Sequence, residues 1–140
     1  MLPLAFVLYF LIYSAIGWII DTSYRSYKGG KFVDGGFFPY LPLCPIYGFG
    51  AMIVLGANQY LHSFPIFGQW LIYVLALAAF EYASGDLILR TFHKRLWNYR
   101  KNAFHIGTFT DLFHGAAWGT FAILLIRYVH PYLESIVGFF

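Results

Sequence analysis

The sequence predicts an all-α integral membrane protein with four transmembrane helices. Hydrophobic residues make up 60% of the chain and aromatic residues 23%, while only 11% are charged, against about 25% in ordinary soluble domains. A chain of 140 residues is too short to bury that much apolar surface in one soluble core. The apolar residues also form continuous runs, which favours membrane helices over the alternating strands of a barrel. We therefore expect a single transmembrane domain over residues 1–140.

Four apolar runs predict the four helices. The first is expected over about 2–25, because its apolar part is long enough to cross a hydrocarbon core of about 30 Å. The others are expected over about 46–62, 66–90 and 109–129. The second and fourth runs have short apolar cores, so we expect them to extend into flanking polar residues or to be shielded by neighbouring helices.

The segment between the first two helices has an unusual composition. Its stretch GGFFPYLPLCP is apolar and aromatic, and Pro39, Pro42 and Pro45 exclude a regular helix there. Irregular backbone at membrane depth is tolerated only where protein covers it. We therefore expect a Pro-rich re-entrant or interfacial segment between helices 1 and 2.

The basic residues predict the orientation in the membrane. Eight of the nine Lys and Arg residues lie in or beside the linkers 21–45 and 91–108, counting Arg90, and only Arg127 lies on the opposite side. The positive-inside rule places these two linkers in the cytoplasm and both termini outside. We expect a multi-pass protein of the cell membrane, whose cations face anionic lipid rather than nucleic acid.

Charged residues within the third apolar run are the first candidates for function. An ionised group at the bilayer centre costs about 2.5–3.5 kcal/mol, so such groups usually face a protein interior. Asp86 and Arg90 are four residues apart and are expected to form an ion pair at the helix end. Glu81 lies about 140° around the helix from Asp86, so we expect it to project toward another helix.

Other polar residues are expected at a similar depth. Asp21 ends the first helix, and Asp111 and His114 open the fourth as neighbours three residues apart. We expect a polar pocket that opens toward the cytoplasm. The candidate binding residues are Glu81, Asp21, Asp111, His114, Trp97 and Asn98. Each also has a structural interpretation, as a boundary residue or as a partner in an interhelical hydrogen bond.

Several functional classes lack their motifs in this sequence. It contains no GxxxxGK[ST], GxGxxG or GxSxG pattern, and we assign no catalytic residue. A zinc site needs three or four ligands, yet no H-E-x-x-H motif is present and Cys44 is the one cysteine. We predict no metal, and the cofactor remains unknown.

Four stretches resemble one family. GWIID, GGFFPYLPLCPIYGFGA, FEYASGDLILRTFHKRLWNYR and AAWGTFAILLIRYVHP are similar to the CmpB-like, ABC-transporter type IV family of bacterial membrane proteins. The resemblance covers about residues 12–131. It implies a polytopic membrane protein in which Asp21, Glu81 and Trp97 are family-type positions. The family more often has Glu in place of Asp21, and Trp-Asp-Tyr in place of Trp97-Asn98-Tyr99.

The sequence leaves three functions open. The leading hypothesis is a small permease-like or ligand-binding membrane component. Because four short helices enclose little volume, it would act as a homo-oligomer or with partner membrane or ATPase subunits. The second is a membrane-embedded enzyme that acts on a lipid or isoprenoid headgroup, with the pocket carboxylates and His114 as acid–base or metal groups. The third is a structural or regulatory membrane partner.

Overall fold

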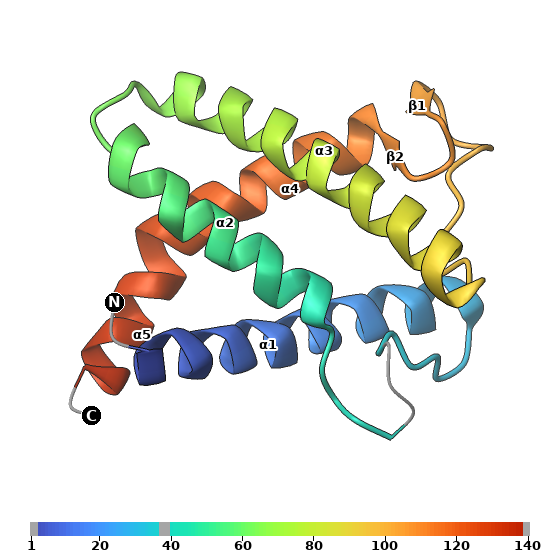
Figure 1. Ribbon diagram of the computed structural model, residues 1–140, viewed down its shortest axis with the longest axis horizontal. Coiled ribbons are helices and arrows are strands. Elements are labelled where there is room, and N and C mark those ends of the chain that lie inside the picture. Colours follow the sequence, from blue (N-terminus) through green and yellow to red (C-terminus); the bar gives the residue numbers. More distant parts are fainter. Residues whose placement is uncertain (1–2, 37–39, 139–140) are drawn as a thin grey trace. The chain divides into compact units, whose positions relative to one another are not determined.

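The computed structural model describes residues 3–36 and 40–138 (Figure 1). Its elements are α1 (Pro3–Gly29), α2 (Pro45–Leu61), α3 (Ile66–Phe92), β1 (His105–Ile106), β2 (Thr110–Asp111), α4 (Leu112–Leu124), a π-helical turn (Leu125–Val129) and α5 (His130–Val137). The backbone divides into two compact units, Met1–Leu55 and Gly56–Phe140. Both are dominated by helices, as the sequence predicts.

Among the described residues, three helical segments are long and apolar enough to cross a membrane. They are Pro3–Gly29, Ile66–Phe92 and Leu112–Val137. The chain is therefore a multi-pass membrane protein. α2 has 17 residues and rises about 26 Å, which falls short of a hydrocarbon core of about 30 Å. A fourth span, and the location of both termini outside, stay predictions.

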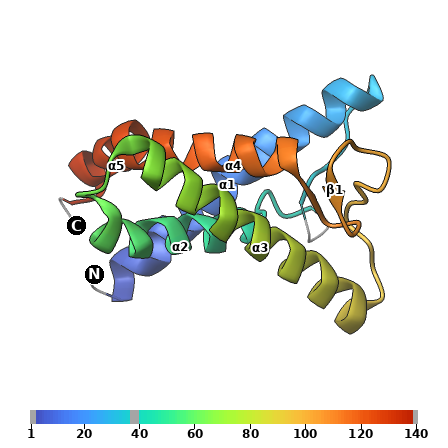
Figure 2. The ribbon, with the colours of Figure 1, turned by 90° about the horizontal axis from the view of Figure 1, so that it is seen from above.

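The last helical run is longer than expected. It starts at Leu112 rather than 109 and continues to Val137 rather than 129. Within it, the His130 N–H donates to the Leu125 carbonyl, five residues back, as in a π-helix. Pro131 then follows directly after the π turn, at the start of α5. α4, the π turn and α5 therefore follow one another as one helical run (Figure 2).

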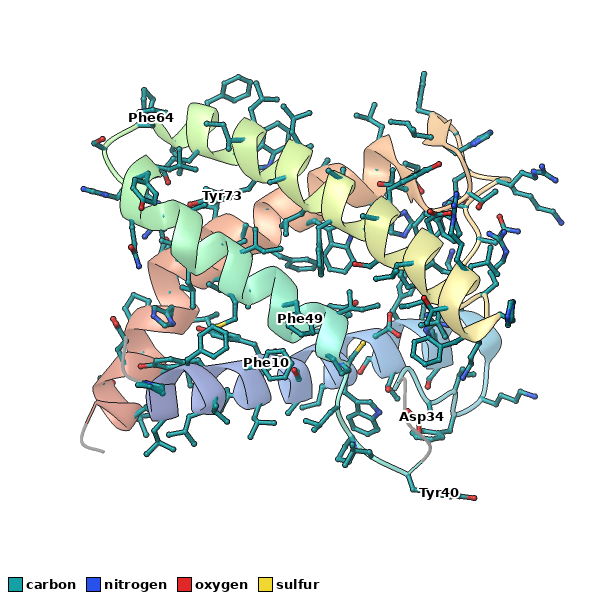
Figure 3. The ribbon with its side chains drawn as sticks, in the orientation of Figure 1. Phe10, Asp34, Tyr40, Phe49, Phe64 and Tyr73 are labelled. Atoms are coloured by element: carbon teal, nitrogen blue, oxygen red, sulfur yellow. The ribbon has the colours of Figure 1, made fainter. Side chains whose placement is uncertain are left out.

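In the first unit, the start of α2 packs against the middle of α1. The Cys44 N–H donates to the Ser14 carbonyl at 3.0 Å. The rings of Phe10 and Phe49 meet edge to face, with centroids 4.8 Å apart (Figure 3). Residues 40–44 are non-helical and α2 begins at Pro45, as the prolines predict. Residues 37–39 of the expected re-entrant segment lie outside the described residues, and that segment stays a prediction.

In the second unit, α3 packs against α4 (Figure 1). Gly115 and Gly119 lie four residues apart on the face of α4 that meets α3. A Cβ atom at Gly119 would contact Val74 and would lie 3.2 Å from the Trp70 carbonyl oxygen. The Trp70 indole also donates to Thr120 Oγ1 at 3.1 Å. The small residues therefore let the two helices approach closely, as in other membrane bundles.

A short two-stranded ribbon precedes α4. β1 and β2 pair antiparallel, with His105 opposite Asp111 and Ile106 opposite Thr110. The all-α prediction missed this ribbon, because strands of two residues are too short to show alternation. The ribbon holds the long loop after α3 close to the first turn of α4, where the polar residues gather.

Candidate functional site

Glu81 lies on the buried side of α3, where its exposed fraction is 6%. The Tyr99 hydroxyl donates to Oε1 and the Thr110 hydroxyl donates to Oε2, both at 3.1 Å. The Trp118 side chain of α4 also faces this carboxyl. Groups from the loop, from β2 and from α4 therefore converge on one carboxylate in a candidate membrane span.

Asp111 is the second buried carboxyl of the site and is 2% exposed. As the N-cap of α4 it accepts a bond from the His114 backbone N–H at 2.7 Å. Its Oδ2 accepts another from Asn102 at 2.8 Å and lies 2.7 Å from His114 Nδ1. Burial by itself raises the pKa of Asp111, but the hydrogen bonds from Asn102 and His114 outweigh it and hold that pKa below its usual range.

The two carboxyls are joined by an aromatic contact. The Tyr99 ring stacks on the His114 imidazole, with centroids 4.1 Å apart and planes 12° apart. Tyr99 thus binds Glu81 through its hydroxyl, while its ring covers His114, which in turn contacts Asp111. We call Glu81, Tyr99, Thr110, Asp111 and His114 the Glu81 cluster.

Trp97 and Asn98 lie in the loop next to the Glu81 cluster and shape its backbone. The Trp97 indole donates to the Phe109 carbonyl at 2.8 Å, one residue before Thr110. Asn98 is exposed, and its side chain accepts a bond from the Arg100 backbone N–H at 3.0 Å within its own turn. Trp97 therefore positions the segment that carries Thr110, whereas Asn98 closes a local turn.

Asp21 belongs to the other unit, Met1–Leu55. Its carboxylate accepts a bond from Arg25 Nε at 2.6 Å and one from the Tyr47 hydroxyl at 3.3 Å. The structure thus brings together Glu81, Asp111 and His114 of the predicted pocket residues, and it gives Asp21 a guanidinium partner of its own. A shared pocket that includes Asp21 stays a prediction.

Asp86 and Arg90 form an ion pair on the surface of α3. Arg90 Nε lies 2.9 Å from Asp86 Oδ2, and their side chains are 78% and 35% exposed. Exposed pairs at this helical spacing contribute about 0.3–0.5 kcal/mol. Each side chain of this pair therefore neutralises the charge of the other near the end of α3, and the pair adds little to stability.

Sequence reasoning did not assign Tyr99 and Thr110 to the site. Their hydrogen bonds depend on how the loop folds back, which residue spacing does not encode. One signal was available, since an Asp directly before an apolar run predicts an N-cap, and that would have fixed the start of α4 at Leu112. Within residues 3–36 and 40–138, no three His, Cys, Asp or Glu side chains gather closely enough to hold a metal ion.

Comparison with known proteins identifies a family. A family model described as "Putative ABC-transporter type IV" matches residues 8–140. No curated protein and no solved structure matches the chain. The family match covers nearly the whole sequence, including the Glu81 cluster and Asp21. This chain belongs to the "Putative ABC-transporter type IV" family of membrane proteins.

Proposed function

We propose that this chain is a permease-like, ligand-binding component of a membrane transport assembly, and that the Glu81 cluster is its binding site. The family description supports a membrane component associated with transport. The observation that carries the proposal is the position of Glu81, a buried carboxyl within the candidate span Ile66–Phe92. Ionisable groups inside membrane spans mark substrate, ion or proton pathways in many membrane proteins.

The charge of the Glu81 cluster favours a cation or a proton as the ligand. The cluster contains two carboxyls, Glu81 and Asp111, and one imidazole, His114. Even with His114 protonated, two ionised carboxylates leave a net negative charge. A bound cation or a transferred proton would neutralise this charge and would lower the cost of holding it away from water.

The chain is expected to work with further subunits. In the most apolar window of the three candidate spans, only 22%, 28% and 22% of the residues are buried. The rest of each window faces lipid or another protein. A transport path would therefore form between copies of this chain, or between it and partner membrane or ATPase subunits. The loop 93–111 would face the cytoplasm, because it carries four of the chain's Lys and Arg residues.

The test of this proposal is complementation of a deletion strain. Glu81→Gln keeps the shape of the side chain and removes its charge. We expect normal abundance in the membrane together with loss of complementation, whereas the control Asp86→Asn, on the exposed side of the same helix, should complement fully. Full complementation by Glu81→Gln at normal abundance would refute the proposal.

A structural role for the Glu81 cluster is the second candidate. Both Glu81 oxygens accept hydrogen bonds from the chain itself, so the cluster also ties the loop to α3. Such a role predicts that Glu81→Gln lowers abundance and complementation in the same proportion. Measuring both quantities in each variant therefore separates the two functions.

A further inference from the structure

Glu81 is closed off from its surroundings. Its exposed fraction is 6%, and both carboxylate oxygens already accept hydrogen bonds, one from Tyr99 and one from Thr110. A ligand or a proton carrier can therefore reach this carboxyl only when a group that covers it moves. Within the unit Gly56–Phe140, the covering groups come from α4 and from the loop 93–111.

Of these two covers, α4 is the fixed one. Gly119 brings α4 so close to α3 that an added Cβ atom would contact Val74. The Trp70 indole of α3 also donates to Thr120 of α4 at 3.1 Å. Closely packed helices transmit strain and leave little free volume between them. A shift of α4 away from Glu81 would therefore disturb the whole interface.

The loop 93–111 is held by far fewer contacts. Residues 93–108 are all half-buried or exposed, and only the last three residues, Phe109, Thr110 and Asp111, are buried. Phe109 is the apolar one of the three, with an exposed fraction of 5%. Segments with few buried contacts open locally at a lower free energy than the helices around them. The loop is therefore the movable cover, and Phe109 attaches it by packing.

Phe109 is seated on Gly85 of α3. A Cβ atom added at Gly85 would contact the Phe109 ring and would lie 3.0 Å from Trp97. The rings of Tyr82 and Trp97 meet the Phe109 ring edge to face, with centroids 5.8 and 6.3 Å away. The Arg95 guanidinium lies 4.9 Å from the centre of the same ring. Gly85 therefore leaves a notch in α3 that the Phe109 ring fills.

The position of Phe109 also sets the position of the two donors to Glu81. Thr110 follows Phe109 directly and donates to Glu81 Oε2. The Tyr99 N–H donates to the Thr108 carbonyl at 2.8 Å, which ties Tyr99 to the residue just before Phe109. When the ring leaves the notch, this segment moves, and both hydroxyls move away from the carboxyl with it.

We propose that the loop 93–111 is the gate of the Glu81 cluster and that Phe109 is the positioning residue that keeps this gate shut. With Phe109 in the Gly85 notch, the hydroxyls of the loop cover the carboxyl. With Phe109 out of the notch, Glu81 is open to a ligand or a proton from the side of the loop. The inference rests on the proposed function, because a buried binding site needs a route for its ligand. Its test measures access to position 81 rather than complementation, so the two can fail separately.

Labelling of an introduced cysteine tests the gate. Glu81→Cys in a chain that also carries Cys44→Ala gives a single thiol at the site, and lipid nanodiscs leave both faces of the membrane open to reagent. The probe is a cationic methanethiosulfonate, which dissolves in water and does not enter lipid. Since Cys cannot replace the two hydrogen bonds of the carboxylate, the labelling rate reports the hold of Phe109.

The test variant is Gly85→Ala, which places a methyl group in the notch. We expect it to speed labelling at position 81 by about tenfold or more, because overpacking a filled site typically costs enough for a tenfold change in an equilibrium constant. The matched control is Gly68→Ala, on the same helix with open space around it. It should change the rate by less than about twofold.

Two further measurements separate an open gate from a general loosening of the protein. Phe109→Ala should also speed labelling at position 81, and Gly85→Ala should add nothing to it, because both variants remove the same contact. A second probe, Val74→Cys, reports on the interface of α3 and α4, where Val74 is buried. Its labelling should stay slow in every variant, whereas separated helices would expose it.

Four results would overturn the proposal. They are unchanged labelling at position 81 in Gly85→Ala, an equal effect of Gly68→Ala, additive effects of Gly85→Ala and Phe109→Ala, and faster labelling at positions 74 and 81 together. If Gly85→Ala does not reach the membrane, Phe109→Leu replaces it, since Leu stays apolar but loses the ring contacts, and unchanged labelling in that variant overturns the proposal equally. Full complementation by Glu81→Gln together with faster labelling in Gly85→Ala would refute the proposed function and support the gate.

Discussion

The hydrogen bond between Thr110 and Glu81 gives the sharpest test of how the site is held together. Thr110→Val removes the hydroxyl and keeps the size and branching of the side chain. Thr110 is 3% exposed and Glu81 is 6% exposed, so water cannot easily replace the lost donor. The variant therefore leaves one carboxylate oxygen with a missing partner inside the protein.

The expected magnitude follows from the geometry. A hydrogen bond to a charged group contributes about 1.5–3 kcal/mol in soluble proteins. Interhelical hydrogen bonds measured by double-mutant cycles within one membrane protein contribute about 0.6 kcal/mol on average and about 1.7 kcal/mol at most. The oxygen–oxygen distance here is 3.1 Å, longer than the 2.5–2.7 Å of strong hydroxyl–carboxylate bonds. We therefore expect Thr110→Val to lower the free energy of unfolding by about 1.5 kcal/mol.

A double-mutant cycle isolates this bond from other effects of the substitution. Thr110→Val, Glu81→Leu and the double variant are unfolded with SDS in mixed lipid–detergent micelles, and helix content is followed by circular dichroism. Leu has no group that accepts a hydrogen bond from Thr110, so each single variant removes the interaction. We expect a coupling free energy of about 1 kcal/mol. Thr91→Val, at an exposed threonine in the last turn of α3, is the control and should change stability by less than about 0.5 kcal/mol. Coupling below about 0.3 kcal/mol would mean that the two side chains act independently, and the network described above would be refuted.

Three further predictions follow from single residues. The pKa of Asp111 is lower in the folded than in the unfolded protein, so ionised Asp111 stabilises the fold fully above its ordinary pKa, and this stabilisation is lost as the pH falls below that value. The acid-dependent part of the unfolding free energy should therefore shrink in Asp111→Asn. Identical pH profiles of the variant and the unaltered chain would contradict this prediction. Burial raises the pKa of Cys44 to about 11, so maleimide should label it slowly in native membranes near pH 7 and quickly after denaturation in SDS, and equal rates would show that the thiol is accessible. In α2, Gly48→Ala should destabilise the protein, because its Cβ would contact Ser14 and lie 2.9 Å from the Phe10 ring. Gly56 has open space around it, so Gly56→Ala should be neutral or up to about 1 kcal/mol stabilising. Equal thermal stability of the two variants would argue against the packing of α1 on α2.

The sequence predicted the helices better than their ends. Long apolar runs are strong signals, and α1, α2 and α3 lie where those runs indicate. The last helix continues through a π turn and ends at Val137 rather than at the predicted residue 129. Such a local change in hydrogen bonding leaves no periodic pattern in the sequence.

The candidate site was only partly accessible to sequence reasoning. A carboxyl within an apolar run is conspicuous, and so Glu81 could be selected from its neighbours alone. Its partners Tyr99 and Thr110 come from a loop of mostly exposed residues and from a strand of two residues. Tyr99 and Thr110 lie 18 and 29 residues after Glu81 in the sequence. Their contact with Glu81 depends on tertiary folding, which local sequence patterns do not predict.

The partners of each carboxylate indicate which one is suited to a changing charge. Asp21 and Asp86 each face an arginine of the same helix, and a guanidinium stabilises only the ionised form of a carboxyl. In the part of the chain that the structure describes, no Lys or Arg pairs with Glu81, which is held by the hydroxyls of Tyr99 and Thr110. A hydroxyl can donate to a carboxylate or accept from a carboxylic acid, so these partners accommodate Glu81 in either state. Exchange of a proton or a cation at Glu81 would therefore leave the surrounding fold intact, whereas neutralising Asp21 or Asp86 would break an ion pair.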